Sequence, residues 1–158
     1  MSHTQELLKI LEDTTKFLQE ISVVEEEKFQ AAMKNHILVI EDCIKKEQAL
    51  LLRSKGLELK RTQIQKAMGA EQKTLRQIIE TADVADKAPL QAAFLKLEEQ
   101  LKHYQEVHEK AKTAIEVNLH RINTQLENLT GKTGEGNTAY SDHGQKVQKP
   151  HTFTSRKI

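Results

Sequence analysis

The sequence predicts an all-α protein, an extended antiparallel hairpin or bundle of three long helices with a short connector helix, coiled-coil-like packing and a flexible C-terminal tail. The first observation is composition: 37% hydrophobic and 4% aromatic residues, no Trp and two Pro leave little to fill a thick core or a sheet. The second is an unbroken 3.5-residue apolar period over residues 89–130, typical of a helix that packs lengthwise on other helices. At ~1.5 Å per residue this helix would be about 60 Å long, which favours a rod over a globule.

The first two long helices are expected over residues 4–33 and 37–68. Ser2 or Thr4 is the candidate N-cap of the first helix, and Asn35 is the candidate break between the two. The first helix is acidic and the second basic. A short turn between long helices of opposite charge predicts an antiparallel hairpin, although exposed ion pairs contribute only ~0.2–1 kcal/mol each.

Two features of these helices carry specific expectations. The acidic triplet of the first helix, Glu25, Glu26 and Glu27, is expected to lie on a solvated face. Gly56, inside the second helix, costs ~1 kcal/mol relative to Ala, and it either permits close approach of another backbone or marks a weak point. The buried stripe of the second helix is expected to comprise Ile37, Ile40, Ile44, Gln48 and Leu51.

The connector is expected as a short amphipathic helix over residues 71–82, after Gly69 ends the second long helix. The third long helix is then predicted to begin at Pro89, which suits a first helical turn, and to end before Gly131. Three polar residues occupy positions of its apolar stripe: His108, Asn118 and Gln125. Such residues either fix the register of the helix pairing or leave this end of it open.

The apolar stripe broadens toward the end of the third helix. In a three-helix hairpin this helix outruns its neighbours unless they are splayed or offset, so part of the stripe is expected to lack an internal partner. An uncovered amphipathic helix can dock another helix, and a homodimer would cover it equally well. The residues concerned form a ladder: Ile115, Leu119, Ile122, Leu126 and Leu129.

The chain changes character after the third helix. Residues 131–158 hold four of the six glycines, five Lys or Arg against two Asp or Glu, and no helical period. We therefore divide the chain into a helical domain, 1–130, and a tail, 131–158, expected to be disordered when nothing is bound.

Several function classes are disfavoured by composition. A net charge of +1 argues against general nucleic-acid binding, which needs a basic face. One cysteine permits no internal disulfide and favours a reducing compartment. The N-terminus lacks the apolar core of a signal peptide, and no run of about eighteen apolar residues predicts membrane insertion. We expect a cytoplasmic protein.

No motif predicts catalysis, a cofactor or a metal site. Gly131, Lys132 and Thr133 match the end of a phosphate-binding loop, but Leu126 stands where the pattern requires its first glycine. The histidines form no recognisable ligand pattern and are expected at the surface. Cys43 is expected to be a buried or half-buried structural thiol.

Five blocks of the sequence form a joint pattern of helix, turn and tail: EEEKFQAAMKNHILVIEDCIKKEQALLL, LELKRTQIQKAMG, HRINTQLENL, AYSDHG in the glycine-rich tail, and the basic terminus SRKI. This pattern resembles that of the FlgN family of flagellar export chaperones. The resemblance implies a non-enzymatic cytoplasmic chaperone that holds hook-associated junction proteins unpolymerised and delivers them to the export gate.

The resemblance also implies roles for particular residues. It places the client on the ladder at the end of the third helix and assigns docking at the export gate to Tyr140. The alternative is a dimeric coiled-coil scaffold or adaptor with no chaperone role.

Overall fold

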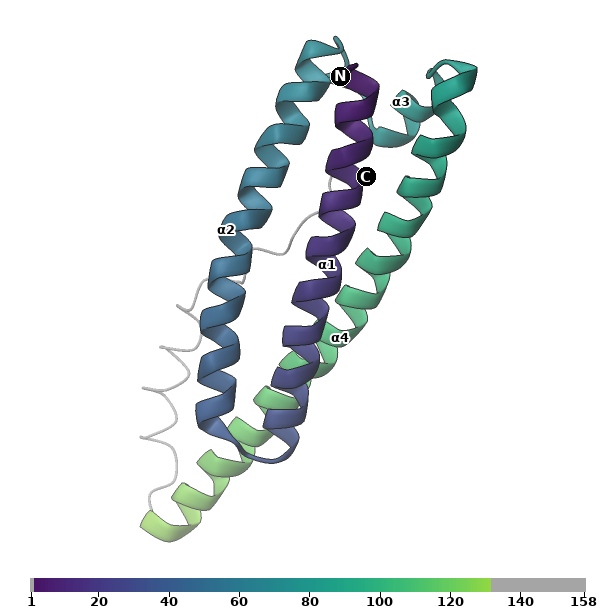
Figure 1. Cartoon of the computed structure of the whole chain (residues 1–158). Helices are drawn as coiled ribbons and strands as arrows, with labels where there is room; N and C mark the ends of the chain where they lie inside the picture. Colours follow the sequence, from purple (N-terminus) through teal and green to yellow (C-terminus); the bar gives the residue numbers. More distant parts are fainter. Residues whose placement is uncertain (1, 132–158) are drawn as a thin grey trace.

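The computed structural model describes residues 2–131 as four helices without strands. In chain order they are α1 (His3–Met33), α2 (Ile37–Ala67), α3 (Leu75–Glu80) and α4 (Val84–Thr130). α1 packs against α2 on one side and against α4 on the other, and α3 packs on α4 (Figure 1). The prediction of an all-α fold with three long helices and a short connector is confirmed. The predicted flexible tail lies outside the described residues.

The hairpin between α1 and α2 forms where the local sequence favours it. The Ser2 hydroxyl accepts a hydrogen bond from the Gln5 amide at 3.2 Å, and the Gln5 side chain accepts one from the Ser2 amide at 3.1 Å. This capping box starts α1. Asn35 adopts a left-handed backbone with φ of 57°, a conformation that Asn tolerates, and the chain reverses there as predicted.

Ion pairs between acidic side chains of α1 and basic side chains of α2 join the two helices. Arg53 Nη1 lies 2.6 Å from Glu20 Oε2, and Lys46 Nζ lies 3.6 Å from Glu27 Oε2. These pairs are largely exposed, so apolar burial contributes most of the stability. The main core lies toward the end of the molecule that α3 closes, and it consists of Leu7, Leu11, Phe17, Leu18, Ile21, Ala70, Leu75, Ile78, Ile79, Leu90, Ala93, Phe94, Leu97 and Leu101.

The buried stripe of α2 differs from the predicted one. Ile37 is 60% exposed, and Ile44 and Gln48 are also exposed. The stripe that faces α1 instead includes the small residues Cys43 and Ser54, both buried. Its partly buried members are Ile40, Glu47, Leu50, Leu57, Arg61, Ile64 and Met68. Ile40 and Leu51 of the predicted stripe are half-buried. Ile37, Ile44 and Gln48 were placed wrongly, because close packing against α1 favours a row with small and polar members.

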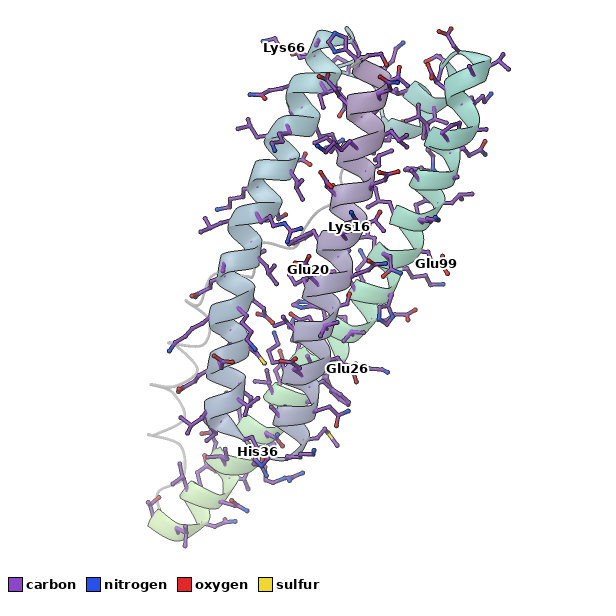
Figure 2. The ribbon with its side chains drawn as sticks, in the orientation of Figure 1. Lys16, Glu20, Glu26, His36, Lys66 and Glu99 are labelled. Carbon is purple, nitrogen blue, oxygen red and sulfur yellow. The ribbon has the colours of Figure 1, made fainter. Side chains whose placement is uncertain are left out.

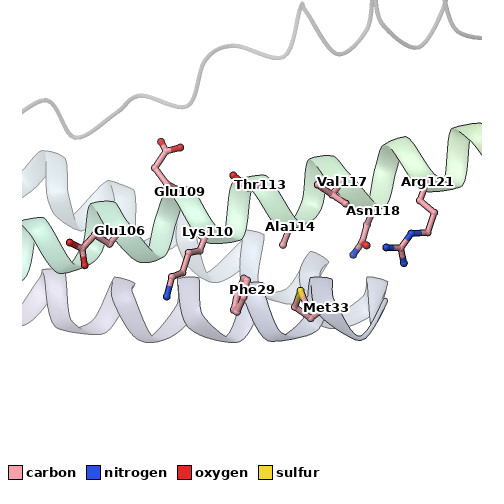
Figure 3. Close-up of a pocket in the computed structure, with 10 residues that line it drawn as sticks. All are labelled: Phe29, Met33, Glu106, Glu109, Lys110, Thr113, Ala114, Val117, Asn118 and Arg121. Atoms are coloured by element: carbon pink, nitrogen blue, oxygen red, sulfur yellow. The ribbon is translucent and has the colours of Figure 1, made fainter.

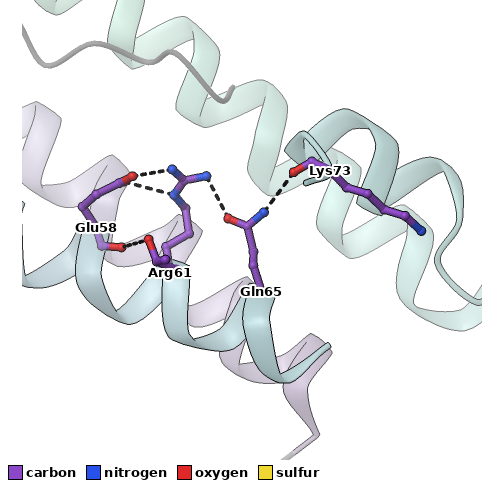
Figure 4. Close-up of polar contacts among 5 residues, drawn as sticks. Glu58, Arg61, Gln65 and Lys73 are labelled. Carbon is purple, nitrogen blue, oxygen red and sulfur yellow. Dashed lines mark hydrogen bonds and ion pairs between the residues drawn. The ribbon is translucent and has the colours of Figure 1, made fainter. Parts of the chain in front are cut away.

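A polar network fixes the end of α2 (Figure 4). The Arg61 guanidinium donates hydrogen bonds to the Glu58 carboxylate and, at 2.9 Å, to Gln65 Oε1. The buried Gln65 amide nitrogen donates to the Lys73 carbonyl at 3.1 Å. Gly69, at φ of 68°, reverses the chain between these groups. The segment between α2 and α3 is therefore held in place by the Gln65 side chain, whose oxygen and nitrogen both form hydrogen bonds.

The boundaries of α3 and α4 also differ from prediction. α3 spans only Leu75–Glu80, because Thr74 and Gln77 form a capping box that starts it late. α4 begins at Val84, so Pro89 lies inside the helix instead of at its first position. A proline there removes one helical hydrogen bond. The burial of Leu90 and Phe94 directly after it favours a continuous helix nonetheless.

Candidate binding surface

The last turns of α4 extend past the turn between α1 and α2 (Figure 1). The buried apolar residues of α4, which include Val107 and Ala111, extend from Leu90 to Ala114. Beyond it the ladder loses its cover: Ile115 is half-buried, and the next four members are exposed. Their exposed fractions are 52% for Leu119, 41% for Ile122, 52% for Leu126 and 84% for Leu129.

These side chains are exposed because α1, which packs against the earlier turns of α4, ends at Met33. The Asn118 side-chain amide donates a hydrogen bond to the Ala32 carbonyl in the last turn of α1. Asn118 thus fixes the register of α4 against the end of α1, one of the two roles expected for polar residues in the stripe. Gln125, the next polar residue in the stripe, is exposed.

The turn itself adds exposed apolar side chains at the same end of the molecule. They are Met33, Ile37, Leu38 and Val39, of which Leu38 is the most exposed at 80%. With Val117 and the exposed ladder residues, nine of the fifteen exposed large hydrophobic side chains in residues 2–131 lie at this end. The surface therefore extends beyond α4. The exposed turn residues were not predicted, because Ile37 was expected in the buried stripe of the second helix.

A groove of about 640 Å³ lies between α1 and α4 beside the exposed ladder. Phe29 and Met33 line it from α1, and Ala114 and Val117 line it from α4 (Figure 3). Its charged lining residues are Glu106, Glu109, Lys110 and Arg121. Apolar side chains with charged neighbours suit the side chains of a docked amphipathic helix.

A buried polar cluster joins the three long helices. Lys28 Nζ lies 3.1 Å from Glu25 Oε1 on α1 and 2.5 Å from Glu47 Oε1 on α2, and His108 Nδ1 of α4 lies 3.3 Å from Glu25 Oε2. Glu25 is only 1% exposed, so its predicted place on a solvated face was wrong. Glu26 and Glu27 are exposed, and Figure 2 shows Glu26 on the outer side of α1. His108 is likewise a partner in the cluster and not a surface histidine.

The cluster shifts the pKa values of its carboxyls in opposite directions. Burial and a hydrogen bond with Glu25 raise the pKa of Glu47 to about 7. Burial also raises the pKa of Glu25, but hydrogen bonds with His108 and Glu47 and the charge of Lys28 outweigh it and lower the pKa to about 2. Burial raises the pKa of Tyr104, which stacks on His108 with ring centroids 5.6 Å apart. The cluster thus holds one carboxylate and one carboxylic acid below pH 7.

The remaining chemical candidates have structural roles. Cys43 is fully buried, and burial raises the pKa of its thiol, which disfavours the reactive thiolate. The prediction of a buried thiol is confirmed. In residues 2–131, no group of three or more His, Cys, Asp and Glu side chains has the geometry of a metal site. The helices of this same region also lack the combination of length and apolarity that crossing a membrane needs.

A long helical hairpin with an uncovered apolar helix end defines a class of small helical proteins that bind other proteins. The chain belongs to the FlgN family, because the family model described as FlgN protein matches residues 1–148. FlgN proteins are chaperones of flagellum biogenesis, so this protein is a chaperone that binds flagellar proteins, and the resemblance drawn from the sequence is confirmed. No curated protein and no solved structure matches the chain.

Proposed function

We propose that this protein binds hook-associated junction proteins in the cytoplasm, prevents their premature polymerisation and delivers them to the export gate of the flagellar type III system. The observation that carries the proposal is the exposed ladder at the end of α4. Leu119, Ile122, Leu126 and Leu129 follow one another at steps of three or four residues and therefore share one face of the helix. A free face of this kind suits an amphipathic helix of the client.

The groove beside the ladder extends the contact toward α1. Phe29, Met33 and Val117 offer apolar surface where the ladder meets the bundle, and a client helix lying along α4 would reach it. Junction proteins polymerise, in the family picture, through terminal helical segments. Covering such a segment keeps the subunit soluble through binding free energy alone, without ATP.

The export-gate step rests on the family resemblance. Tyr140, assigned to gate docking by that resemblance, lies outside the described residues. Replacing Tyr140 by alanine should impair export and leave client binding unchanged.

A double replacement tests the client surface. Ile122→Asp together with Leu126→Asp places two charges in the apolar contact, and we expect it to abolish capture of hook-associated subunits in a pull-down. Both side chains are substantially exposed, so circular dichroism should remain helical. The matched control is Leu95→Asp, which changes an exposed leucine on α4 far from the ladder and should bind normally.

Two outcomes contradict the proposal. Unchanged capture by the double variant would remove the ladder as the client surface. A tight dimer in sedimentation that buries residues 115–129, combined with no binding of flagellar subunits, would instead identify the alternative, a dimeric scaffold.

A further inference from the structure

A second apolar surface runs along the outer face of α2, away from α1. Leu38, Leu52 and Leu59 are exposed by 80%, 70% and 60%, and their spacings of fourteen and seven residues place them in one row of the helix. Ile37 and Ile44 are exposed beside this row. The stripe that faces α1, with buried Cys43 and Ser54, lies elsewhere on the helix surface. We call the row and its neighbours the outer α2 stripe.

The charges on this stripe are mainly positive. Lys45 falls within the leucine row, seven residues after Leu38 and seven before Leu52, and Lys55 lies beside it. Within residues 2–131, neither lysine forms an ion pair, whereas Lys46 pairs with Asp42 and Glu27. Glu41 shares this face, four residues before Lys45, and Asp42, which pairs with Lys46, flanks it. The outer α2 stripe therefore offers apolar contacts and unpaired cations together.

We propose that the outer α2 stripe binds an acidic amphipathic helix of another protein, at a site distinct from the ladder on α4 that adjoins the exposed turn at Ile37 and Leu38. Leucines of such a helix would pack between Leu38, Leu52 and Leu59, and its flanking carboxylates would pair with Lys45 and Lys55. Pairs of this kind across a helix interface set partner choice and orientation more than affinity.

Charge also argues against two other occupants. A second copy of the same stripe would bring a surplus of like charges together, which disfavours self-association. A bilayer would place Lys45, in the middle of the leucine row, at a depth where acyl chains offer no counter-charge. A partner helix can present a carboxylate at that position.

The test uses the full chain and two synthetic helical peptides with identical leucine heptads, one flanked by glutamates and one by lysines. We expect the glutamate peptide to bind at least ~10-fold more tightly in fluorescence anisotropy. Leu52→Asp with Leu59→Asp should abolish this binding. Lys45→Glu with Lys55→Glu should reverse the preference between the peptides, and because both positions are exposed the fold should be kept.

The client-surface variant, Ile122→Asp with Leu126→Asp, is the control and should bind the glutamate peptide like the unmodified protein. Equal binding of both peptides would overturn the proposal, and so would binding lost in this control but kept in the α2 variants. If sedimentation shows a dimer and the Leu52→Asp substitution disrupts it, then the occupant of the stripe is a second copy of the chain. Preferential binding to phosphatidylcholine–phosphatidylglycerol vesicles through the same residues would identify a membrane surface. Either result would also overturn the proposal.

Discussion

At the scale of single residues, the buried cluster of Glu25, Lys28, Glu47 and His108 places four ionisable groups where the three long helices meet. Two carboxyls share one lysine, and burial disfavours ionising both. A proton on Glu47 leaves one negative charge, that of Glu25, beside the shared lysine. The cluster therefore links the packing of the helices to the proton concentration.

The stability of the protein should fall between pH 5 and pH 8. The pKa of Glu47 is raised from 4.5 to about 7 in the folded protein, so the folded state holds a proton that the unfolded state has lost. Its stabilising contribution is full below pH 4.5 and is lost as the pH rises through 7. We expect the free energy of unfolding in urea to fall by about 2 kcal/mol over this range.

The variant Glu47→Gln is the control for this effect, because glutamine mimics the protonated acid. Its unfolding free energy should stay nearly constant between pH 5 and pH 8. Below pH 4.5 both proteins should weaken, because the pKa of Glu25 is lowered to about 2 and its contribution is lost as the pH falls toward that value. An unchanged slope in Glu47→Gln would rule out Glu47 as the source.

The sequence predicted the residue-scale features unevenly. Glu25 and Lys28 are three residues apart, a spacing that allows a local pair. The pairing of Glu25 with Glu47 and His108 depends on how three helices meet, which residue types alone do not specify. The buried thiol of Cys43 was predictable because it lay next to apolar residues of α2.

At the scale of helices, Gly56 provides a test of what stabilises α2. A Cβ atom added at Gly56 would meet no atom within 4 Å, so the glycine does not serve a close backbone approach. Of the two roles considered from the sequence, a weak point in the helix is the one that fits. We expect Gly56→Ala to raise the free energy of unfolding by about 1 kcal/mol, because alanine loses less backbone freedom on folding.

Gly69→Ala is the matched control and should have the opposite effect. Gly69 has equally open surroundings but a left-handed φ of 68°, which costs a residue with a Cβ atom about 1 kcal/mol or more. Denaturant unfolding of both variants measures the two effects. Stabilisation by both substitutions, or by neither, would contradict the interpretation.

Helix limits and helix faces differed in how well they could be predicted. The span of α1 and the turn at Asn35 followed from capping and turn residues, which act locally. The buried stripe of α2 did not, because two apolar rows compete on that helix and packing against α1 selects between them. The start of α4 was misplaced because a proline at the first position of a helix is common but not required.

At the scale of the whole molecule, core and exposed apolar surface are separated along its length. The main core lies toward α3, and nine of the large exposed apolar side chains lie at the end where α1 meets α2. Regions with few buried contacts open more readily than regions held by the core. The sequence predicted an extended molecule whose third helix outruns its neighbours, but not that the turn joins the exposed surface.

Hydrogen exchange should reveal this separation. We expect the amides of residues 119–130 to exchange at least ~10-fold faster than those of residues 93–111, since the former lie beyond the last turn of α1. Adding a hook-associated subunit should slow exchange in 119–130 selectively. Equal protection of both segments in the free protein would contradict the exposed state of the α4 end.

The exposed end of α4 makes the length of the protein independent of its stability. The final turns of α4 do not pack in the core, so adding or removing a heptad there changes the length of the protein without disturbing the core. Among homologues, the length of this segment should therefore vary more than that of the other helices, and under the proposed function a longer or shorter segment would fit a longer or shorter client helix.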